Sequence, residues 1–562
     1  MRPNPSAAGP VTPRRRAATL AVVLLLAGSP AVAQPAAAGT EPADRAAEID
    51  AIFSWAAPDA PGCAVAVARE GKVVLERTHG LADLERGTPI GPDTLFDAGS
   101  VVKQFVAAAV LLLVDEGRLS LDGDIRAHLP ELPDYGHKVT IDHLLTHTSG
   151  LRDWTALLMF SDEDEDAMSA ILRQRGLNFP PGEEWSYSNS GYVLLKELIA
   201  RAAGVPFSRF ADERLFKPLG MSRTRYEDEP RPGVDNLALA YEKRGDRWEQ
   251  DMMLGKERGG GALLTTAPDL LLWNEAIENA ALGAFVTEKL QEPARLNNGR
   301  ELGYARGLFL DENPGGRVIW HSGSAGAYKA MLARFPEQRL SIAILSNAGD
   351  TAQRTLSARR LYDVFVPGVR EAAGEPADEG VSVPADQLAA RAGLFLSDAA
   401  RPLRLGVEEG RLRVLGGPVL VAESPDRFRN PEAEVGFLSG DRFELRFLSP
   451  DEFDLISMEG EATRYRRARP GDPAPESLQA FAGRYESRDL NAVLEIAPGD
   501  DGLVVRLNDS PPFAFPAVAP DTFLRGMMTL RFRRDGDGSV AGLLYNNPVL
   551  RDVAFTPLPR EE

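Results

Sequence analysis

The chain has 562 residues, of which 44% are hydrophobic, and a formal net charge of -19 at pH 7. This length exceeds that of one ordinary domain, and the apolar content is sufficient for several cores, which excludes global disorder. Because phosphate binding needs a basic surface, the acidic balance excludes a nucleic-acid partner from the expected functions.

The N-terminus has the pattern of an export signal, and we expect residues 1–33 to be a signal peptide. Arg14–Arg16 is a charged segment, Ala17–Ala27 is a short apolar run, and Ala31–Ala33 is an A-x-A cleavage sequence. The apolar run is shorter than the roughly 20 residues that a membrane-spanning helix needs. The sequence therefore predicts an exported protein, periplasmic or secreted, cleaved before Gln34 and without stable membrane insertion afterwards. An uncleaved anchor is the alternative.

The next region, residues 41–370, reads as one domain with strands at both ends. Cys63–Ala68 and Val73–Arg77 predict a hairpin, and helical patterns dominate from Ser100 to about Gly283. Strand patterns return at Val318–His321, Tyr328–Phe335 and Leu340–Ser346. This order predicts an α+β domain in which one antiparallel sheet takes strands from both ends and is flanked by helices.

Ser100 and Lys103 form an S-x-x-K motif in front of the long apolar run 105–114. The spacing places both side chains on one face of a helix, one turn apart. A serine nucleophile needs a neighbour that takes its proton, and a desolvated lysine can be that base. The alternative for Ser100 is a helix N-cap hydroxyl.

Two further motifs follow in the same predicted domain. Tyr187-Ser188-Asn189 is a Y-x-N triplet, and His321-Ser322-Gly323 is an H-x-G triplet after the strand pattern. Tyrosine beside a lysine can handle a proton, and asparagine offers both an amide donor and an acceptor. Glycine lets a strand backbone lie close to a ligand. The alternatives are a structural tyrosine and a turn-forming asparagine.

A metal site is not expected. His143 and His147 have the i, i+4 spacing of a zinc-binding helix, but the intervening residues lack the glutamate of H-E-x-x-H. We predict neither a metal nor a cofactor, and a structural role for His147.

Residues 371–387 are rich in Ala, Gly, Glu and Pro and are predicted to be a linker. Beyond it, Leu388–Ser397 is echoed by Leu478–Ser487, with a proline-rich segment between the two units. Two repeats are too few for a solenoid. We therefore predict two small antiparallel β-barrels, at residues 388–469 and 477–560.

Taken in order, S-x-x-K, Y-x-N and H-x-G resemble the serine β-lactamase and penicillin-binding-protein superfamily. The resemblance is strongest to the class C β-lactamase-like branch, with its D-alanyl-D-alanine carboxypeptidases, D-aminopeptidases and esterases. The segments 144–151, 216–221 and 259–270 are also similar to that branch. The resemblance covers roughly residues 41–370 and implies a β-lactamase/transpeptidase-like fold. D-Aminopeptidases of the family carry two C-terminal barrels as well.

The resemblance also implies roles for the motif residues. Ser100 would be the nucleophile, and Lys103 and Tyr187 the proton-handling groups, with their division of labour left open. Asn189 would bind a substrate amide and orient Lys103. The backbone N–H groups of Ser100 and Ser324 would form the oxyanion hole.

His321 replaces the lysine of the family's K-T-G motif, and with Gly323 and Ser324 it would line the substrate site. Histidine is largely neutral near pH 7, so a substrate with a free carboxylate is less assured.

We therefore expect an exported serine hydrolase that cleaves an amide or ester bond in a small-molecule or peptide substrate through an acyl-Ser100 intermediate. A peptidase or amidase acting on D-amino-acid or peptidoglycan-like peptides is slightly favoured. An esterase of the same fold is the first alternative, and a β-lactamase is less expected because antibiotic turnover needs no barrels. An alternative from another class is a catalytically inactive binding protein. The sequence makes no prediction of oligomeric state.

Overall fold

The structure is a computed structural model that describes residues 43–157, 160, 165–229, 233–253, 259, 261–313, 315–349, 351–367, 380–430, 443–457, 462–469, 475–508 and 510–559. The predicted signal peptide and residues 371–379 of the predicted linker lie outside these ranges. No helix within the ranges is long and apolar enough to cross a membrane.

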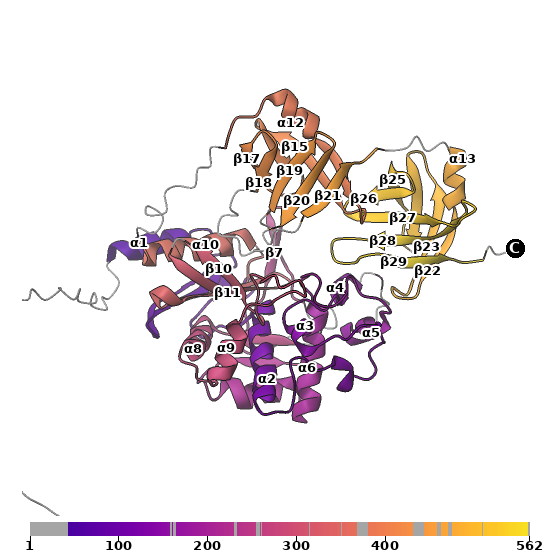
Figure 1. Cartoon of the computed structure of the whole chain (residues 1–562). Coiled ribbons are helices and arrows are strands. Elements are labelled where there is room, and N and C mark those ends of the chain that lie inside the picture. Colours follow the sequence, from indigo (N-terminus) through magenta and orange to yellow (C-terminus); the bar gives the residue numbers. More distant parts are fainter. Residues whose placement is uncertain are drawn as a thin grey trace, which may run out of the picture.

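A six-stranded antiparallel sheet forms the centre of the first domain (Figure 1), in the order β10-β11-β12-β13-β1-β2. The strands are β1 Cys63–Arg69, β2 Lys72–His79, β10 Phe309–Asn313, β11 Gly316–Ala325, β12 Tyr328–Phe335 and β13 Leu340–Ser346. Strand β1 pairs with β13 along its whole length, from Cys63 opposite Ser346 to Arg69 opposite Leu340. The prediction of one sheet with strands from both ends of the domain is confirmed.

Strand β1 is buried on both faces, and its sequence differs between them. Ala64, Ala66 and Ala68 belong to the large core on the side of the long helix that follows Ser100. Cys63, Val65 and Val67 belong to a second core on the opposite face. Small side chains on the first face let a helix approach the sheet closely, and the helix that packs against β1 is α8, Ala267–Glu278.

Helices cover both faces of the sheet. One layer contains α2 Val102–Asp115, α3 Ile141–Leu145, α4 Trp154–Leu157, α5 Ala167–Arg173, α6 Asn189–Ala203, α7 Phe207–Ala211, α8 Ala267–Glu278 and α9 Ala284–Gln291. The other contains α1 Ala43–Ile52 and α10 Thr351–Phe365. Short turns of other helix types are η1 Gly99–Val101, η2 Ile125–Ala127, η4 Asp212–Phe216 and η6 Pro336–Gln338.

Short strands also lie outside the six-stranded sheet. Three precede Ser100, namely β3 Leu81–Asp83, β4 Thr88–Pro89 and β5 Phe96–Asp97. Four lie in the region predicted to be mainly helical, namely β6 Arg225–Glu227, β7 Tyr241–Arg244, β8 Arg247–Gln250 and β9 Ala262–Thr265. Strands of two to four residues contain too few alternations to produce a period-2 pattern, so the sequence did not indicate them.

Two eight-stranded antiparallel units follow, as predicted. The first runs in the order β16-β15-β14-β21-β20-β19-β18-β17 and is nearly closed, and the second, β22 to β29, is a closed barrel. The first comprises α12 Ala385–Arg391, which begins inside the predicted linker, then β14 Gly393–Ser397, β15 Pro402–Glu408, β16 Arg411–Val414, β17 Val421–Ser424, β18 Arg427–Arg429, β19 Phe443–Ser449, β20 Glu452–Ser457 and β21 Ala462–Arg467. The second comprises α13 Pro475–Leu478, η7 Gln479–Phe481, β22 Gly483–Ser487, β23 Ala492–Pro498, β24 Gly502–Leu507, β25 Phe513–Ala519, β26 Thr522–Arg525, β27 Met528–Arg534, β28 Val540–Asn546 and β29 Val553–Pro557.

Candidate active site

Ser100 lies in the 3-10 turn η1, between the short strand β5 and helix α2. The carboxylate of Asp97 accepts a hydrogen bond from the N–H of Gly99 at 2.9 Å, and Gly99 has a φ of +50°, which glycine adopts at low cost. No side-chain cap is formed at the start of η1 or of α2. The Ser100 hydroxyl therefore does not cap the helix and is available to its side-chain neighbours.

Lys103 is the principal neighbour of Ser100. Its Nζ lies 3.0 Å from Ser100 Oγ and donates to Asn189 Oδ1 at 2.9 Å. The side chain is 4% exposed, and Nζ lies 4.7 Å and 5.3 Å from the ring centres of Tyr187 and Tyr192. Burial lowers the pKa of Lys103 to about 7, against the opposing effect of the Asp153 carboxylate. A substantial fraction of this amine is therefore neutral near pH 7.

Tyr187 approaches Ser100 from the segment before α6, and the Ser100 hydroxyl is near enough to act on the pKa of the phenol. Burial raises the pKa of Tyr187 well above its usual value, and the contact with Ser100 offsets only part of this rise. The phenol is thus protonated near pH 7. Of the two proton-handling candidates, the lysine is the one that is ready to accept a proton.

Asn189 is the first residue of α6, and its position depends on a residue that the sequence analysis missed. Asp153 accepts from the N–H of Asn189 at 2.6 Å and from its Nδ2 at 3.1 Å. This carboxylate is 4% exposed and turns the amide oxygen of Asn189 toward Lys103. No local pattern distinguishes Asp153. Its position directly after the segment 144–151 was the only available signal.

Strand β11 contributes His321, Gly323 and Ser324, and it packs against the backbone around Ser100. A Cβ atom on Gly323 would lie 1.8 Å from the carbonyl oxygen of Ala98, and one on Gly99 would lie 2.6 Å from the N–H nitrogen of Ser324. Only glycine at both positions permits this approach. The close contact brings the backbone N–H of Ser324 to the turn that contains Ser100.

His321 is buried at 1% exposure and belongs to an aromatic group with His147 and Tyr304. Tyr304 was also missed from the sequence, and its hydroxyl lies 3.1 Å from Nε2 of His147 and 3.3 Å from Nε2 of His321. Nδ1 of His321 lies 2.6 Å from the carbonyl oxygen of Ser322, which only accepts, so Nδ1 carries a proton. In neutral His321, Nε2 is then an acceptor that faces the phenol.

The histidines considered for a metal have other partners. His143 Nδ1 accepts from the N–H of Thr140 at the start of α3, and His147 Nδ1 accepts from the N–H of Ser188 at 3.1 Å. Burial lowers the pKa of His147 well below its usual value, so the ring is neutral. Among the residues that the structure describes, no group of three or more His, Cys, Asp or Glu side chains could hold a metal ion.

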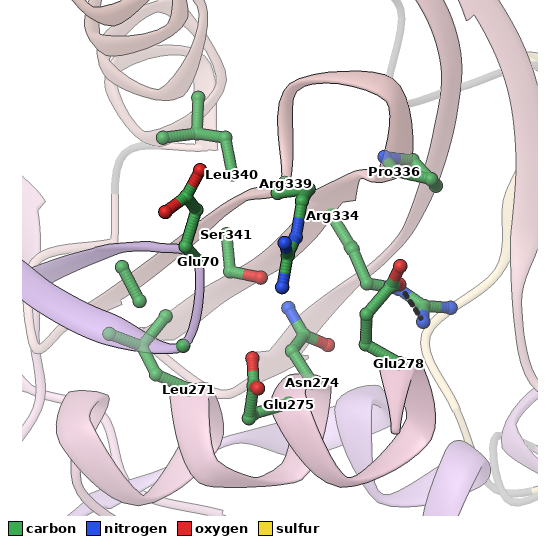
Figure 2. Close-up of a pocket in the computed structure, with 12 residues that line it drawn as sticks. Glu70, Leu271, Asn274, Glu275, Glu278, Arg334, Pro336, Arg339, Leu340 and Ser341 are labelled. Atoms are coloured by element: carbon green, nitrogen blue, oxygen red, sulfur yellow. Dashed lines mark hydrogen bonds and ion pairs between the residues drawn. The ribbon is translucent and has the colours of Figure 1, made fainter. Parts of the chain in front are cut away.

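A separate crevice lies between α8, the β1–β2 turn and the β12–β13 turn (Figure 2). Arg334 forms an ion pair with Glu278 at 3.0 Å on one wall, and Asn274 donates to the carbonyl of Ala333. None of the residues grouped around Ser100 lines this crevice. The candidate reactive side chains therefore lie around Ser100 at the start of α2, away from this crevice.

Comparisons with known proteins find relatives among penicillin-binding proteins, D-aminopeptidases and esterases. The family model described as "Beta-lactamase" matches residues 50–365. "Penicillin-binding protein 4*" of Bacillus subtilis (strain 168) is 31% identical over 308 residues, which cover 50% of this chain and 67% of that protein. A "D-aminopeptidase" of Brucella anthropi is 26% identical over 532 residues, which cover 88% of this chain and 95% of that enzyme. "Esterase EstB" of Burkholderia gladioli is 38% identical over 208 residues, or 33% of this chain and 53% of the esterase.

The packing of β11 against η1 generates a test. Gly323→Ala should lower the rate at which a fluorophosphonate probe labels Ser100 by about 100-fold, because the new Cβ must displace β11 from the Ala98 carbonyl and carry the Ser324 N–H away. Ser322→Ala on the same strand is the matched control and should label at nearly the unmodified rate. A Gly323→Ala protein that labels within twofold of the unmodified chain would contradict this view of the contact.

Proposed function

Because the chain belongs to the beta-lactamase family and is a serine hydrolase of that fold, we propose that it cleaves an amide or ester bond through a covalent acyl intermediate on Ser100. The observation that supports this most directly is the pair of contacts at Ser100 Oγ, with the amine of Lys103 and the phenol of Tyr187. A serine hydroxyl held between a buried amine and a buried phenol can pass its proton directly to a neighbouring side chain, without the help of solvent water.

In the proposed acylation, the Ser100 oxygen attacks the substrate carbonyl while its proton moves to neutral Lys103. The N–H groups of Ser100 and Ser324 stabilise the oxyanion. Tyr187 donates its proton to the leaving nitrogen or oxygen and is reprotonated by Lys103, so the C–N or C–O bond breaks without a free cation or phenolate. Water then attacks the acyl group, with the same groups accepting and returning the proton.

The proposed substrate class is a D-amino-acid or peptidoglycan-like peptide. The match to a D-aminopeptidase includes most of both chains, barrels included, whereas the match to the esterase is confined to a third of this chain. His321 replaces the lysine of the family's K-T-G motif, so the site lacks that fixed cation for a terminal carboxylate, which favours substrates cleaved away from a free C-terminus. An esterase of the same fold is the second candidate, because an ester needs no carboxylate contact either.

Export is part of the proposal. Residues 1–33 have the charge, apolar run and A-x-A sequence of a cleavable signal. We expect the mature protein to begin at Gln34 and to reach the periplasm or the medium. Mass spectrometry of the protein recovered from fractionated cells tests this expectation, and an intact Met1 start in every fraction would contradict it.

A substrate panel tests the proposed reaction. D-Aminoacyl nitroanilides should be cleaved faster than short-chain nitrophenyl esters and much faster than nitrocefin, while Ser100→Ala should abolish turnover and fluorophosphonate labelling together. Preference for the nitrophenyl esters would select the esterase. Native protein that resists labelling as completely as Ser100→Ala would leave the inactive binding protein as the better description.

The pKa of Lys103 sets the expected pH dependence. A base with a pKa of about 7 is protonated and inactive below that pH, so kcat/KM should fall about tenfold per unit below pH 7 and level off above it. Tyr187→Phe is the matched control: turnover should slow, but the ascending limb should stay in place because the phenol is neutral throughout this range. A flat profile between about pH 5.5 and 8.5 would remove Lys103 as the base.

A further inference from the structure

The second barrel contacts the catalytic domain through the turn between β22 and β23, residues 488–491. In Figure 1 this barrel lies beside α4 and α5. The backbone carbonyl of Asp489 accepts from Arg173 Nε at 3.0 Å and from Gln174 Nε2 at 2.6 Å. Leu490 is fully buried and shares an apolar cluster with Leu157 of α4. The turn is thus packed into the catalytic domain.

The same turn supplies a charge to a buried cation. Arg152 Nη1 donates to the carboxylate of Asp489, and the two side chains are 5% and 18% exposed. Gln174 Oε1 accepts from the same nitrogen at 3.3 Å but is neutral. Within the described ranges, Asp489 is the only carboxylate in an ion pair with Arg152. Removing one partner of such a pair leaves a buried charge uncompensated, which is strongly unfavourable.

Arg152 lies one residue before Asp153, the carboxylate that holds Asn189. The Arg152 carbonyl accepts from Ser190 Oγ at 2.7 Å, and Ser190 Oγ accepts from the N–H of Trp154 at 2.8 Å. These bonds fasten residues 152–154 to the first turn of α6. A continuous set of contacts therefore leads from Asp489 through Arg152 and Asp153 to Asn189, whose amide oxygen meets Lys103.

We propose that Asp489 of the second barrel is a positioning residue of the catalytic centre. By neutralising Arg152, it keeps residues 152–154 in place, so that Asp153 holds Asn189 against Lys103. This inference rests on the proposed function of Ser100 and Lys103, and it assigns the barrel a part in that function without any contact with the substrate.

The physical consequence of losing Asp489 has a definite direction. An unpaired guanidinium at Arg152 moves toward water or toward the neighbouring carboxylate of Asp153, and both movements weaken the bonds from Asp153 to Asn189. The negative charge of Asp153 raises the pKa of Lys103 against the lowering effect of burial. Weakening that influence lowers the pKa of Lys103 further. A contribution to folding alone would not change this titration.

The test measures the second-order rate of fluorophosphonate labelling at Ser100 as a function of pH, on the full chain, with thermal unfolding measured alongside. Asp489→Asn should label about 10- to 100-fold more slowly, because a small displacement of catalytic groups typically lowers the rate by that factor. Its titration midpoint should lie below that of the unmodified chain. Asp489→Glu retains the charge and should restore the midpoint.

Arg551→Gln is the matched control for docking. It breaks a second ion pair between the same barrel and the catalytic domain, that of Arg551 with Glu184 at 2.6 Å, without touching Arg152. We expect a lower unfolding temperature but an unchanged midpoint. The double variant Arg152→Gln/Asp489→Asn leaves no unpaired guanidinium, so it should fold even where Asp489→Asn does not, and its labelling rate and midpoint should lie close to those of the unmodified chain.

Labelling of Asp489→Asn at the unmodified rate and midpoint would overturn the inference. A double variant that folds but labels slowly and with a lowered midpoint would also overturn it, because the charge of Arg152 would then not be the cause. An equal midpoint shift in Arg551→Gln would also overturn it, because the effect would then belong to docking in general. Unmodified protein that folds but does not label would overturn the proposed function itself, and the premise of this inference with it.

Discussion

The group of side chains around Ser100 depends on one buried amine, that of Lys103. Lys103 is enclosed by two tyrosine rings and by the core around α2, and its hydrogen bonds go to Ser100 and Asn189. Burial of a lysine is unfavourable for its charged form, and this cost is what makes the group a base near neutral pH. Each of the other features acts on this environment: glycines bring β11 close, and Asp153 limits how far the pKa falls.

The parts of the site that lie in local motifs could be predicted from the sequence, and those fixed by distant contacts could not. Ser100 and Lys103 are one helical turn apart, and Tyr187 and Asn189 share one short segment. The spacing within each motif and the order of the motifs along the chain together indicated these residues. Asp153 lies 36 residues from the asparagine that it holds, and Tyr304 lies 157 residues from His147. A single aspartate or tyrosine in one sequence has nothing to distinguish it until the fold brings its partner to it.

The same reasoning applies to the architecture. Alternation and turn signals predicted the hairpin at the start of the sheet and two small antiparallel barrels, because these patterns are local. They could not predict that the second barrel inserts a turn into the catalytic domain, since Arg152 and Asp489 are 337 residues apart. The echo between the two C-terminal units even suggests equivalence, yet only the second contributes the buried carboxylate at Arg152 in the described structure.

The histidine on β11 fits the electrostatics of a site built around a partly neutral lysine. A lysine at the position of His321 would add a fixed cation to a cluster that already contains Lys103, and a second positive charge lowers the pKa of its neighbour. His321 instead donates its Nδ1–H to the Ser322 carbonyl, while the hydroxyl of Tyr304 lies between its Nε2 and that of the neutral His147. The pKa of Lys103 is governed by burial, by Asp153 and by Lys196. Compared with a lysine at the same position, the histidine therefore places no fixed cation beside the base or the substrate.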